Sequence, residues 1–218
     1  MHFLCKNLSM HVVVITNDEL KKELLEQTPS DQLQLQFIDR PDEFPVGSSA
    51  DACIDLLFDG TKERSRLLHT LNAKITVINA VHVTLAETDP TFIRINAWPG
   101  FLKRELIEAA AVDADREAAA YLFGLFGKKT EWVPDICGFI SARVVATIIN
   151  EAFFALEENI STEKEIDTAM KLGTNYPLGP FEWAEKIGIK EIYTLLHKLS
   201  KDESRYIPCK LLDKKALA

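Results

Sequence analysis

The stretch HVVVITNDEL, residues 11–20, decides the fold because it joins an apolar, β-branched strand directly to a helix. The turn between the two contains no glycine. A turn that binds a pyrophosphate needs glycines, which allow the tight bend and the close approach of the phosphates to the helix start. Thr16 and Glu19 instead have the spacing of a capping box, and Asp18 adds negative charge beside Glu19. We therefore expect this turn to repel a phosphate.

Composition narrows the class of protein. The chain has 218 residues, of which 47% are hydrophobic, and a formal net charge of −8. An acidic chain without a basic run is not expected to bind nucleic acid or an anionic membrane. Residues 1–10 lack the long apolar core of a signal peptide, so we interpret them as an N-terminal extension. The four cysteines are scattered (Cys5, Cys53, Cys137 and Cys209), which predicts no metal site or disulfide framework and indicates a reducing cytoplasm.

The first part of the chain alternates short apolar runs with amphipathic ones, which predicts a parallel sheet covered by helices. Predicted strands cover residues 11–16, 33–38, 52–58, 74–79, 92–97 and 105–110, with one further strand at 130–133. Predicted helices cover residues 17–27, 61–72 and 113–126.

The pattern becomes helical from Pro134 onward. Helices are predicted at 144–156, after a capping box formed by Thr162 and Glu165, at 181–187 and at 191–199. The sequence thus predicts three parts, an extension at 1–10, an α/β domain at 11–133 and an all-helical domain at 134–218.

Two motifs in the helical part are more specific than any periodicity. They are DICGFISAR at residues 135–143 and DTAMKLGTNYPLGPFEW at residues 167–183. Both resemble the C-terminal domain of the 3-hydroxyacyl-CoA dehydrogenase family. The segment RYIP at residues 205–208 fits the same domain, and ADACID at residues 50–55 is similar to a strand of the family's first domain. Turn chemistry alone explains the glycines and prolines of the second motif, so we favour a structural role for it.

This resemblance implies an α/β plus all-α architecture, with a reduced Rossmann-like parallel-sheet domain followed by the all-helical C-terminal domain of that family. The stretch between Asp39 and Ala50 is short where the family inserts a pair of helices, so the first domain is trimmed. The resemblance also implies a homodimer through the helical domain. The long apolar run at residues 144–156 agrees with a shared face, although a central helix of a monomer would look the same.

The resemblance further implies which residues would carry catalysis. Members of the family use a histidine as general base and a glutamate that orients it, with serine and asparagine near the substrate oxygen. Glu108 matches the family glutamate, and counting back from it places the histidine position on Asn96. An amide cannot accept a proton from an alcohol at neutral pH. The family asparagine aligns with Ala142, and Asn79 lies at the end of the preceding strand.

Two other residues have weaker claims. The family serines align with Val81 and His82, and His82 is either a displaced base or an ordinary packing residue, which we favour. Glu108 without its histidine is favoured as a strand-edge carboxylate. Asp39 follows the second strand, where a dinucleotide-binding domain places an acid for the ribose, but an aspartate in such a turn is common without a ligand.

Two functions stay open at this point. The first is a divergent member without hydride transfer and without a cofactor, which binds an acyl-CoA-like molecule, another small ligand between the domains, or a protein partner. The second is an active NAD-dependent oxidoreductase acting on 3-hydroxyacyl-CoA or a related hydroxy acid in fatty acid metabolism. The missing glycines and the residues Asn96 and Ala142 favour the first.

Overall fold

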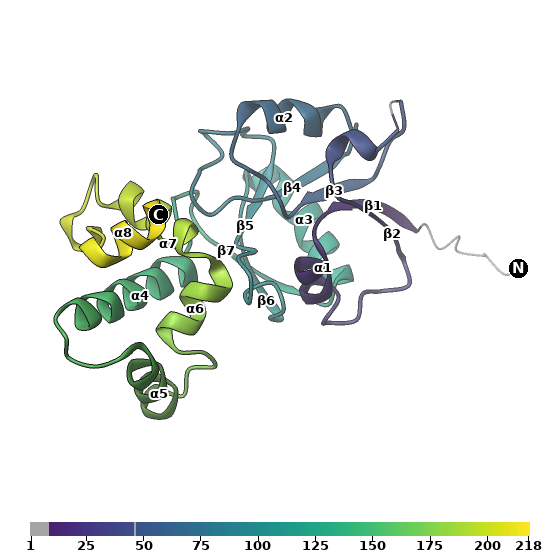
Figure 1. Ribbon diagram of the computed structural model, residues 1–218. Helices are drawn as coiled ribbons and strands as arrows, with labels where there is room; N and C mark the ends of the chain where they lie inside the picture. The colour runs from purple at the N-terminus through teal and green to yellow at the C-terminus, as the bar shows by residue number, and fades with distance from the viewer. Residues whose placement is uncertain (1–8, 46) are drawn as a thin grey trace, which may run out of the picture. The chain divides into compact units, whose positions relative to one another are not determined.

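The computed structural model describes residues 9–45 and 47–218 (Figure 1). The chain divides into two units that meet between Ile136 and Cys137. The first unit is α/β and the second is all-helical, which confirms the predicted fold class. The first strand begins at Met10, inside the predicted extension 1–10, and residues 1–8 of that extension lie outside the described part. No helix in the described ranges is long and apolar enough to cross a membrane.

The first unit is built on a seven-stranded sheet with the order β2-β1-β3-β4-β5-β6-β7. Its strands are β1 (Met10–Ile15), β2 (Leu33–Ile38), β3 (Ala52–Asp55), β4 (Ile75–Asn79), β5 (Ile93–Ile95), β6 (Leu106–Ala110) and β7 (Lys129–Trp132). All neighbours run parallel except β5 and β6, which are antiparallel. The central strands are buried on both faces, which explains their continuous apolar runs.

Helices cover both faces of this sheet (Figure 1). They are α1 (Asp18–Leu24), α2 (Lys62–His69) and α3 (Asp113–Leu125), with a short 3-10 turn η1 (Pro41–Glu43) after β2. Side chains of α1 and α3 join one core cluster, which contains Val12 and Val14 of β1. Leu68 of α2 joins the cluster on the opposite face, which contains Val13 and Ile15.

The start of α1 differs from its prediction. Asn17, not Thr16, is the N-cap, and its side-chain oxygen accepts a hydrogen bond from the Leu20 amide at 2.9 Å. The predicted box of Thr16 and Glu19 is therefore wrong. The reason is that Thr16 still belongs to the sheet, since its amide donates to the carbonyl of Ile38 at 3.0 Å and its side chain is buried.

The second unit contains five helices and a short 3-10 turn in residues 137–218. They are α4 (Ser141–Glu157), α5 (Glu163–Thr174), α6 (Pro180–Ile187), α7 (Ile189–Leu199), η2 (Ser204–Tyr206) and α8 (Lys210–Leu217). The capping box predicted for Thr162 and Glu165 is confirmed at the start of α5. The sequence interpretation did not include α8.

The motif at residues 167–183 holds the turn between α5 and α6. The buried Asp167 carboxylate accepts hydrogen bonds from the amides of Phe181 (2.8 Å) and Glu182 (3.3 Å), so it caps α6. Glu182 in turn accepts a bond from the Gly179 amide and forms an ion pair with Lys171. A Cβ on Gly179 would lie 2.3 Å from the Asp167 carboxylate, so only glycine fits there. The residues of the motif thus interact with one another and stabilise the turn.

The motif at residues 135–143 is organised around Arg143. Its Nε donates to the Cys137 carbonyl at 2.8 Å, and its guanidinium also lies near the ring of Tyr206. Gly138 has a φ of +89°, and a Cβ there would lie 2.8 Å from the Arg143 side chain. Both motifs therefore have a structural explanation within the helical unit.

Candidate functional site

The carboxyl ends of the parallel strands form the edge where α/β sheets bind their ligands. The side chains with candidate roles follow these strand ends. Asp39 follows β2, His82 follows β4, Asn96 follows β5, and Asn79 ends β4. Glu108 comes to the same edge from β6, because β6 runs antiparallel to β5.

Asn96 and Glu108 form a pair. The Asn96 Nδ2 donates to Glu108 Oε2 at 3.0 Å, and the Asn96 amide donates to the Glu108 carbonyl at 3.2 Å. The Asn96 Oδ1 also accepts a bond from the Trp98 amide at 3.4 Å. The carboxamide is buried and oriented from both ends. Glu108 thus contacts the position where the resemblance expects a histidine, but this position holds a group that cannot take up a proton.

The Asn79 side chain forms hydrogen bonds with the surrounding backbone. Its Oδ1 accepts a bond from the Ala97 amide at 3.0 Å, and its Nδ2 donates to the carbonyls of Leu56 (3.2 Å) and Ala97 (3.4 Å). This side chain joins the ends of β3, β4 and β5. Its role in the described contacts is to fix the strand ends.

His82 lies beside an aromatic residue. Its ring centroid is 5.8 Å from that of Trp98, which is buried and also contacts Phe101. His82 itself is half-buried. A contact with a buried aromatic ring is the kind that a packing residue makes. The catalytic interpretation of His82 stays an untested prediction.

The loop after β5 is fixed to the rest of the first unit by buried polar groups. The Lys128 ammonium donates to the carbonyls of Leu102 and Arg104, and Gln27 donates to the Lys103 carbonyl at 2.9 Å. Burial lowers the pKa of the Lys128 ammonium, and the nearby Glu23 carboxylate opposes that shift. Backbone carbonyls that are bound in this way hold the loop in one conformation.

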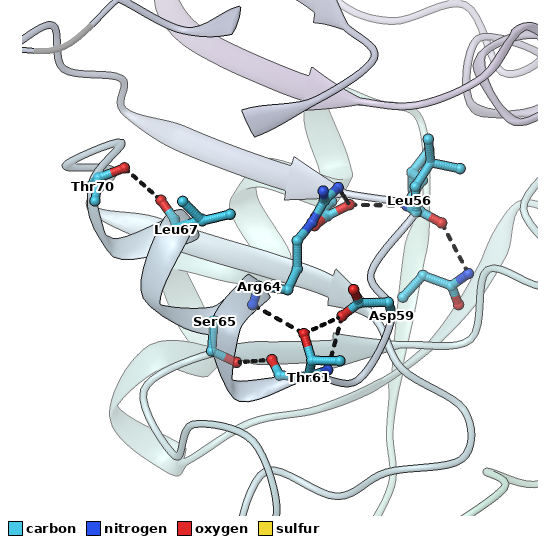
Figure 2. A network of polar contacts seen from close by, with 10 residues as sticks. Leu56, Asp59, Thr61, Arg64, Ser65, Leu67 and Thr70 are labelled. Carbon is cyan, nitrogen blue, oxygen red and sulfur yellow. Dashed lines mark hydrogen bonds and ion pairs between the residues drawn. The ribbon is translucent and has the colours of Figure 1, made fainter. Parts of the chain in front are cut away.

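The β3–α2 turn carries a buried ion pair that sequence reasoning missed (Figure 2). The Asp55 carboxylate accepts two hydrogen bonds from Arg64, at 2.7 and 3.1 Å, and a third from the Leu57 amide. Burial raises the pKa of the Asp55 carboxyl, and the pair with Arg64 opposes the shift. Figure 2 shows Arg64 beside Asp59 and Thr61, of which Thr61 caps the start of α2 by accepting from the Arg64 amide and also donates to Asp59. The signal was available, because Asp55 ends an otherwise apolar strand and requires a cation.

The start of α1 and the end of β2 offer little to a dinucleotide. Asp18 and Glu19 are exposed in the first turn of α1, and Asn17 already caps that helix. Asp39 is exposed, and its backbone amide donates to Glu43 at 3.3 Å. Among the described residues, no hydrogen bond joins Asp39 to Asn96 or Glu108.

Comparison with known proteins identifies the family. Residues 138–218 match the sequence model of the 3-hydroxyacyl-CoA dehydrogenase C-terminal domain. A 3-hydroxyadipyl-CoA dehydrogenase of Escherichia coli (strain K12) is 44% identical over 115 residues, which are 51% of this chain. The helical part of the chain, residues 138–218, therefore belongs to the family of 3-hydroxyacyl-CoA dehydrogenase C-terminal domains.

Other relatives agree with this assignment. A 3-hydroxybutyryl-CoA dehydrogenase of Bradyrhizobium diazoefficiens is 37% identical over 113 residues. The matched part spans 24% of the E. coli relative and 39% of the Bradyrhizobium relative. The solved structure of (S)-3-hydroxybutyryl-CoA dehydrogenase from Ralstonia eutropha has a TM-score of 0.70 at 20% identity, covering 94% of this chain and 92% of that one. This last likeness supports the fold.

The start of α1 does not have the features of a turn that binds a pyrophosphate. It has no glycine, Asn17 already binds the Leu20 amide, and the first helical turn carries Asp18 and Glu19, which would repel a phosphate. Asp39, the acidic residue after β2, is the element of a dinucleotide site that the described residues retain.

Proposed function

We propose that this 3-hydroxyacyl-CoA dehydrogenase family member does not transfer hydride and serves as a binding protein. The observation that carries the proposal is the pair of Asn96 and Glu108. The glutamate that would orient a general base orients an amide instead, at 3.0 Å. Loss of a general base costs a factor of about 10² to 10⁴ in rate, and the α1 turn removes the cofactor contacts as well.

Two measurements test this proposal. Calorimetry should show no micromolar binding of NADH, because Asp18 and Glu19 repel its pyrophosphate. The protein should also fail to reduce acetoacetyl-CoA with NADH at a rate comparable with that of an active family member assayed in parallel. Brisk turnover or micromolar NADH binding by the wild-type protein would overturn the proposal.

The variant Asn96→His separates the two defects. It restores a titratable ring next to Glu108 but leaves the α1 turn unchanged. We expect it to remain inactive. Asp18→Asn combined with Glu19→Gln removes the charge at the start of α1, and NADH binding that appears only in this variant would show that the charge is the obstacle.

An active NAD-dependent oxidoreductase is the second candidate. The observation in its favour is that Glu108 keeps its place on β6 and that His82 lies at the same edge of the sheet. In this case His82→Ala and Glu108→Gln would both abolish the turnover of the wild-type protein. With no turnover in the wild-type protein, this candidate is excluded.

A homodimer through the helical unit completes the proposal. Two apolar hollows, the larger with a volume of about 330 Å³, lie between α4, α5 and α6 and share Ile148, Met170 and Pro180. Val144, one helical turn before Ile148, is 51% exposed. A helix that carries this much outward apolar surface favours a shared face. Light scattering should give at least twice the chain mass of 24.6 kDa, and Val144→Asp should halve the measured mass, whereas the control Lys190→Glu on α7 should not change it.

A further inference from the structure

The open edge of the sheet at β2 has no strand beside it among the described residues. The usual doubly wound order, 3-2-1-4-5-6, places one more strand outside the second one. Here the sheet order ends at β2, next to β1, as Figure 1 also shows. Between β2 and β3 the described residues form only the short turn η1 at Pro41–Glu43. Within residues 9–45 and 47–218, β2 is therefore an edge strand with no neighbour on its outer side.

The backbone of β2 presents every second residue to this edge. β2 pairs with β1 along its whole length, from Leu33 to Ile38. At the two ends of the pairing, the carbonyls of Gln32 and Ile38 accept bonds from β1 and from Thr16 just after it. Parallel strands alternate the direction of their backbone groups, so the even-numbered residues face β1. The amides and carbonyls of Leu35 and Phe37 and the Leu33 carbonyl consequently face outward, whereas the Leu33 amide donates to the Ser30 carbonyl at 3.1 Å.

Nothing in the sequence of β2 protects this edge. The six residues LQLQFI contain no charge, no proline and no glycine, and their register with β1 is unbroken. Natural edge strands are normally protected by charged side chains, prolines, bulges or a covering segment. Leu33, Leu35 and Phe37 pack against one core cluster but stay half-buried, with Lys21 lying 4.2 Å from the Phe37 ring centroid. The edge is thus regular, uncharged and apolar on one face.

We propose that β2 pairs with β2 of a second copy of this chain, antiparallel and about a two-fold axis. An antiparallel strand forms its hydrogen bonds with outward-facing groups, so Leu35 pairs through both its amide and its carbonyl, and the Phe37 amide donates to the Leu33 carbonyl of the second copy. A register centred on Leu35 places Leu35 opposite its own copy and Leu33 opposite Phe37. The even-numbered residues Gln34 and Gln36 then lie opposite each other on the other face.

This register makes the strand complementary to itself. Apolar side chains meet apolar ones on one face, and the two glutamines meet on the other, which are favourable cross-strand pairs without any charge repulsion within β2. A two-fold axis uses the same surface on both copies and closes the edge. A foreign peptide would need its own matching alternation, whereas the second copy has it necessarily. The pairing is independent of the helical unit, because β2 belongs to the first unit.

The test substitutes the central residue of the edge. Leu35→Pro removes an outward amide and leaves the bonds to β1, which edge strands tolerate. Leu35→Lys places two like charges opposite each other. Leu35→Val is the matched control, since it keeps the amide and the apolar side chain. Mass is measured by light scattering over a range of concentrations, and thermal unfolding reports whether each variant is folded.

We expect Leu35→Pro and Leu35→Lys each to halve the wild-type mass, and Leu35→Val to retain it. If the wild-type protein is a dimer through β2 alone, loss of the β2 interface gives a monomer. If it also uses the helical face, loss of the β2 interface again halves the mass. The variants of Leu35 therefore test the β2 interface separately from the helical one. The variant Val144→Asp then reports on the helical face, and its effect leaves the result for Leu35 unchanged. A monomeric wild-type protein, or a mass that Leu35→Lys does not lower, would overturn the proposal.

Amide hydrogen exchange of the wild-type protein gives a second measurement that does not depend on folding of a variant. Pairing predicts slow exchange of the Leu35 and Phe37 amides, comparable with that of Gln36, whose amide faces β1. Exchange of Leu35 and Phe37 at the rate of an exposed amide would contradict the pairing. Slow exchange with a mass that Leu35→Lys leaves unchanged would show that another segment covers the edge, and it would reject the second copy as the occupant.

Discussion

Both carboxylate oxygens of Glu23 accept a hydrogen bond from the backbone amide of Gly100, at 2.7 and 2.8 Å. Glu23 is buried in α1, and Gly100 lies in the loop after β5 with a φ of +91°. Together with Lys128, this contact fixes the loop that follows Asn96 to α1. We expect Glu23→Gln to lower the free energy of unfolding by about 2 kcal/mol, because a neutral carboxamide offers the Gly100 amide one acceptor oxygen in place of two carboxylate oxygens.

Urea denaturation measures this change. Glu26→Gln, three residues later and exposed in the turn after α1, is the control and should change the free energy of unfolding by less than about 0.5 kcal/mol. Equal effects of the two variants would show that the contact with Gly100 does not stabilise the fold.

The glycine of the helical motif provides a second prediction. Gly179→Ala brings a methyl group to within 2.3 Å of Asp167, so the cap of α6 must move. We expect a loss of about 2 kcal/mol in the free energy of unfolding. Gly173→Ala is the control in the same motif, because no atom lies within 4 Å of its added Cβ, and it should be neutral or slightly stabilising. Thermal unfolding that ranks the two variants in the opposite order would refute the steric explanation.

The pair of Asp55 and Arg64 predicts a contrast between two arginines of α2. Arg64→Met leaves the buried Asp55 carboxylate without its cation and should cost about 3 kcal/mol. Arg66→Met removes an ion pair with Glu63 whose side chains are 75% and 77% exposed, and it should cost less than about 1 kcal/mol. Adding Asp55→Asn to Arg64→Met should recover part of the loss. A double variant no more stable than Arg64→Met alone would argue against an uncompensated charge.

Asp51 predicts a dependence on pH. The hydrogen bond from Lys74, at 2.8 Å, and a further bond from the His11 amide lower the pKa of the Asp51 carboxyl below its ordinary value of 3.8. A lowered carboxyl pKa stabilises the folded state above pH 3.8, and this contribution is lost as the pH falls through the folded pKa. Asp51→Asn should therefore destabilise the protein at pH 6 and have a diminishing effect below pH 3.8.

Urea denaturation at several pH values compares the two proteins. In a Lys74→Met background the difference should shrink, because the bond from Lys74 is the largest cause of the shift. A difference between wild type and Asp51→Asn that stays constant from pH 6 downward would refute this prediction.

Most strands and helices could be predicted from the sequence, because apolar runs and amphipathic periods are local signals. The prediction for β2 at residues 33–38 coincides with the structure, and the helix predicted at 113–126 ends one residue earlier. The strand predicted at 52–58 stops at Asp55, where the Asp55 carboxylate accepts a bond from the Leu57 amide and residues 56–57 form a turn. The apolar run continues through this turn, so hydrophobicity alone does not show where the strand ends. Helix α8 was missed because it is short and weakly amphipathic.

The candidate site was predictable only in part. Counting along the resemblance placed Asn96 twelve residues before Glu108, and the two side chains do form a hydrogen bond. The attachment of the loop by Glu23 and Lys128 was not predictable, because both side chains look like exposed charges in the sequence. Burial of a charge depends on partners that are distant in the chain. The roles of Glu108, His82 and Asp39 stay predictions.

Asp167, Gly179 and Glu182 form these hydrogen bonds with one another and with the backbone at the start of α6. Selection for a folded helical unit is therefore enough to preserve this motif, whether or not a chain transfers hydride. A sequence search based on the motif therefore detects proteins that share the fold of the helical unit. A search with this motif should accordingly find inactive chains together with active enzymes. Whether a chain transfers hydride must be judged from other positions, namely the one that Asn96 occupies here and the turn before α1.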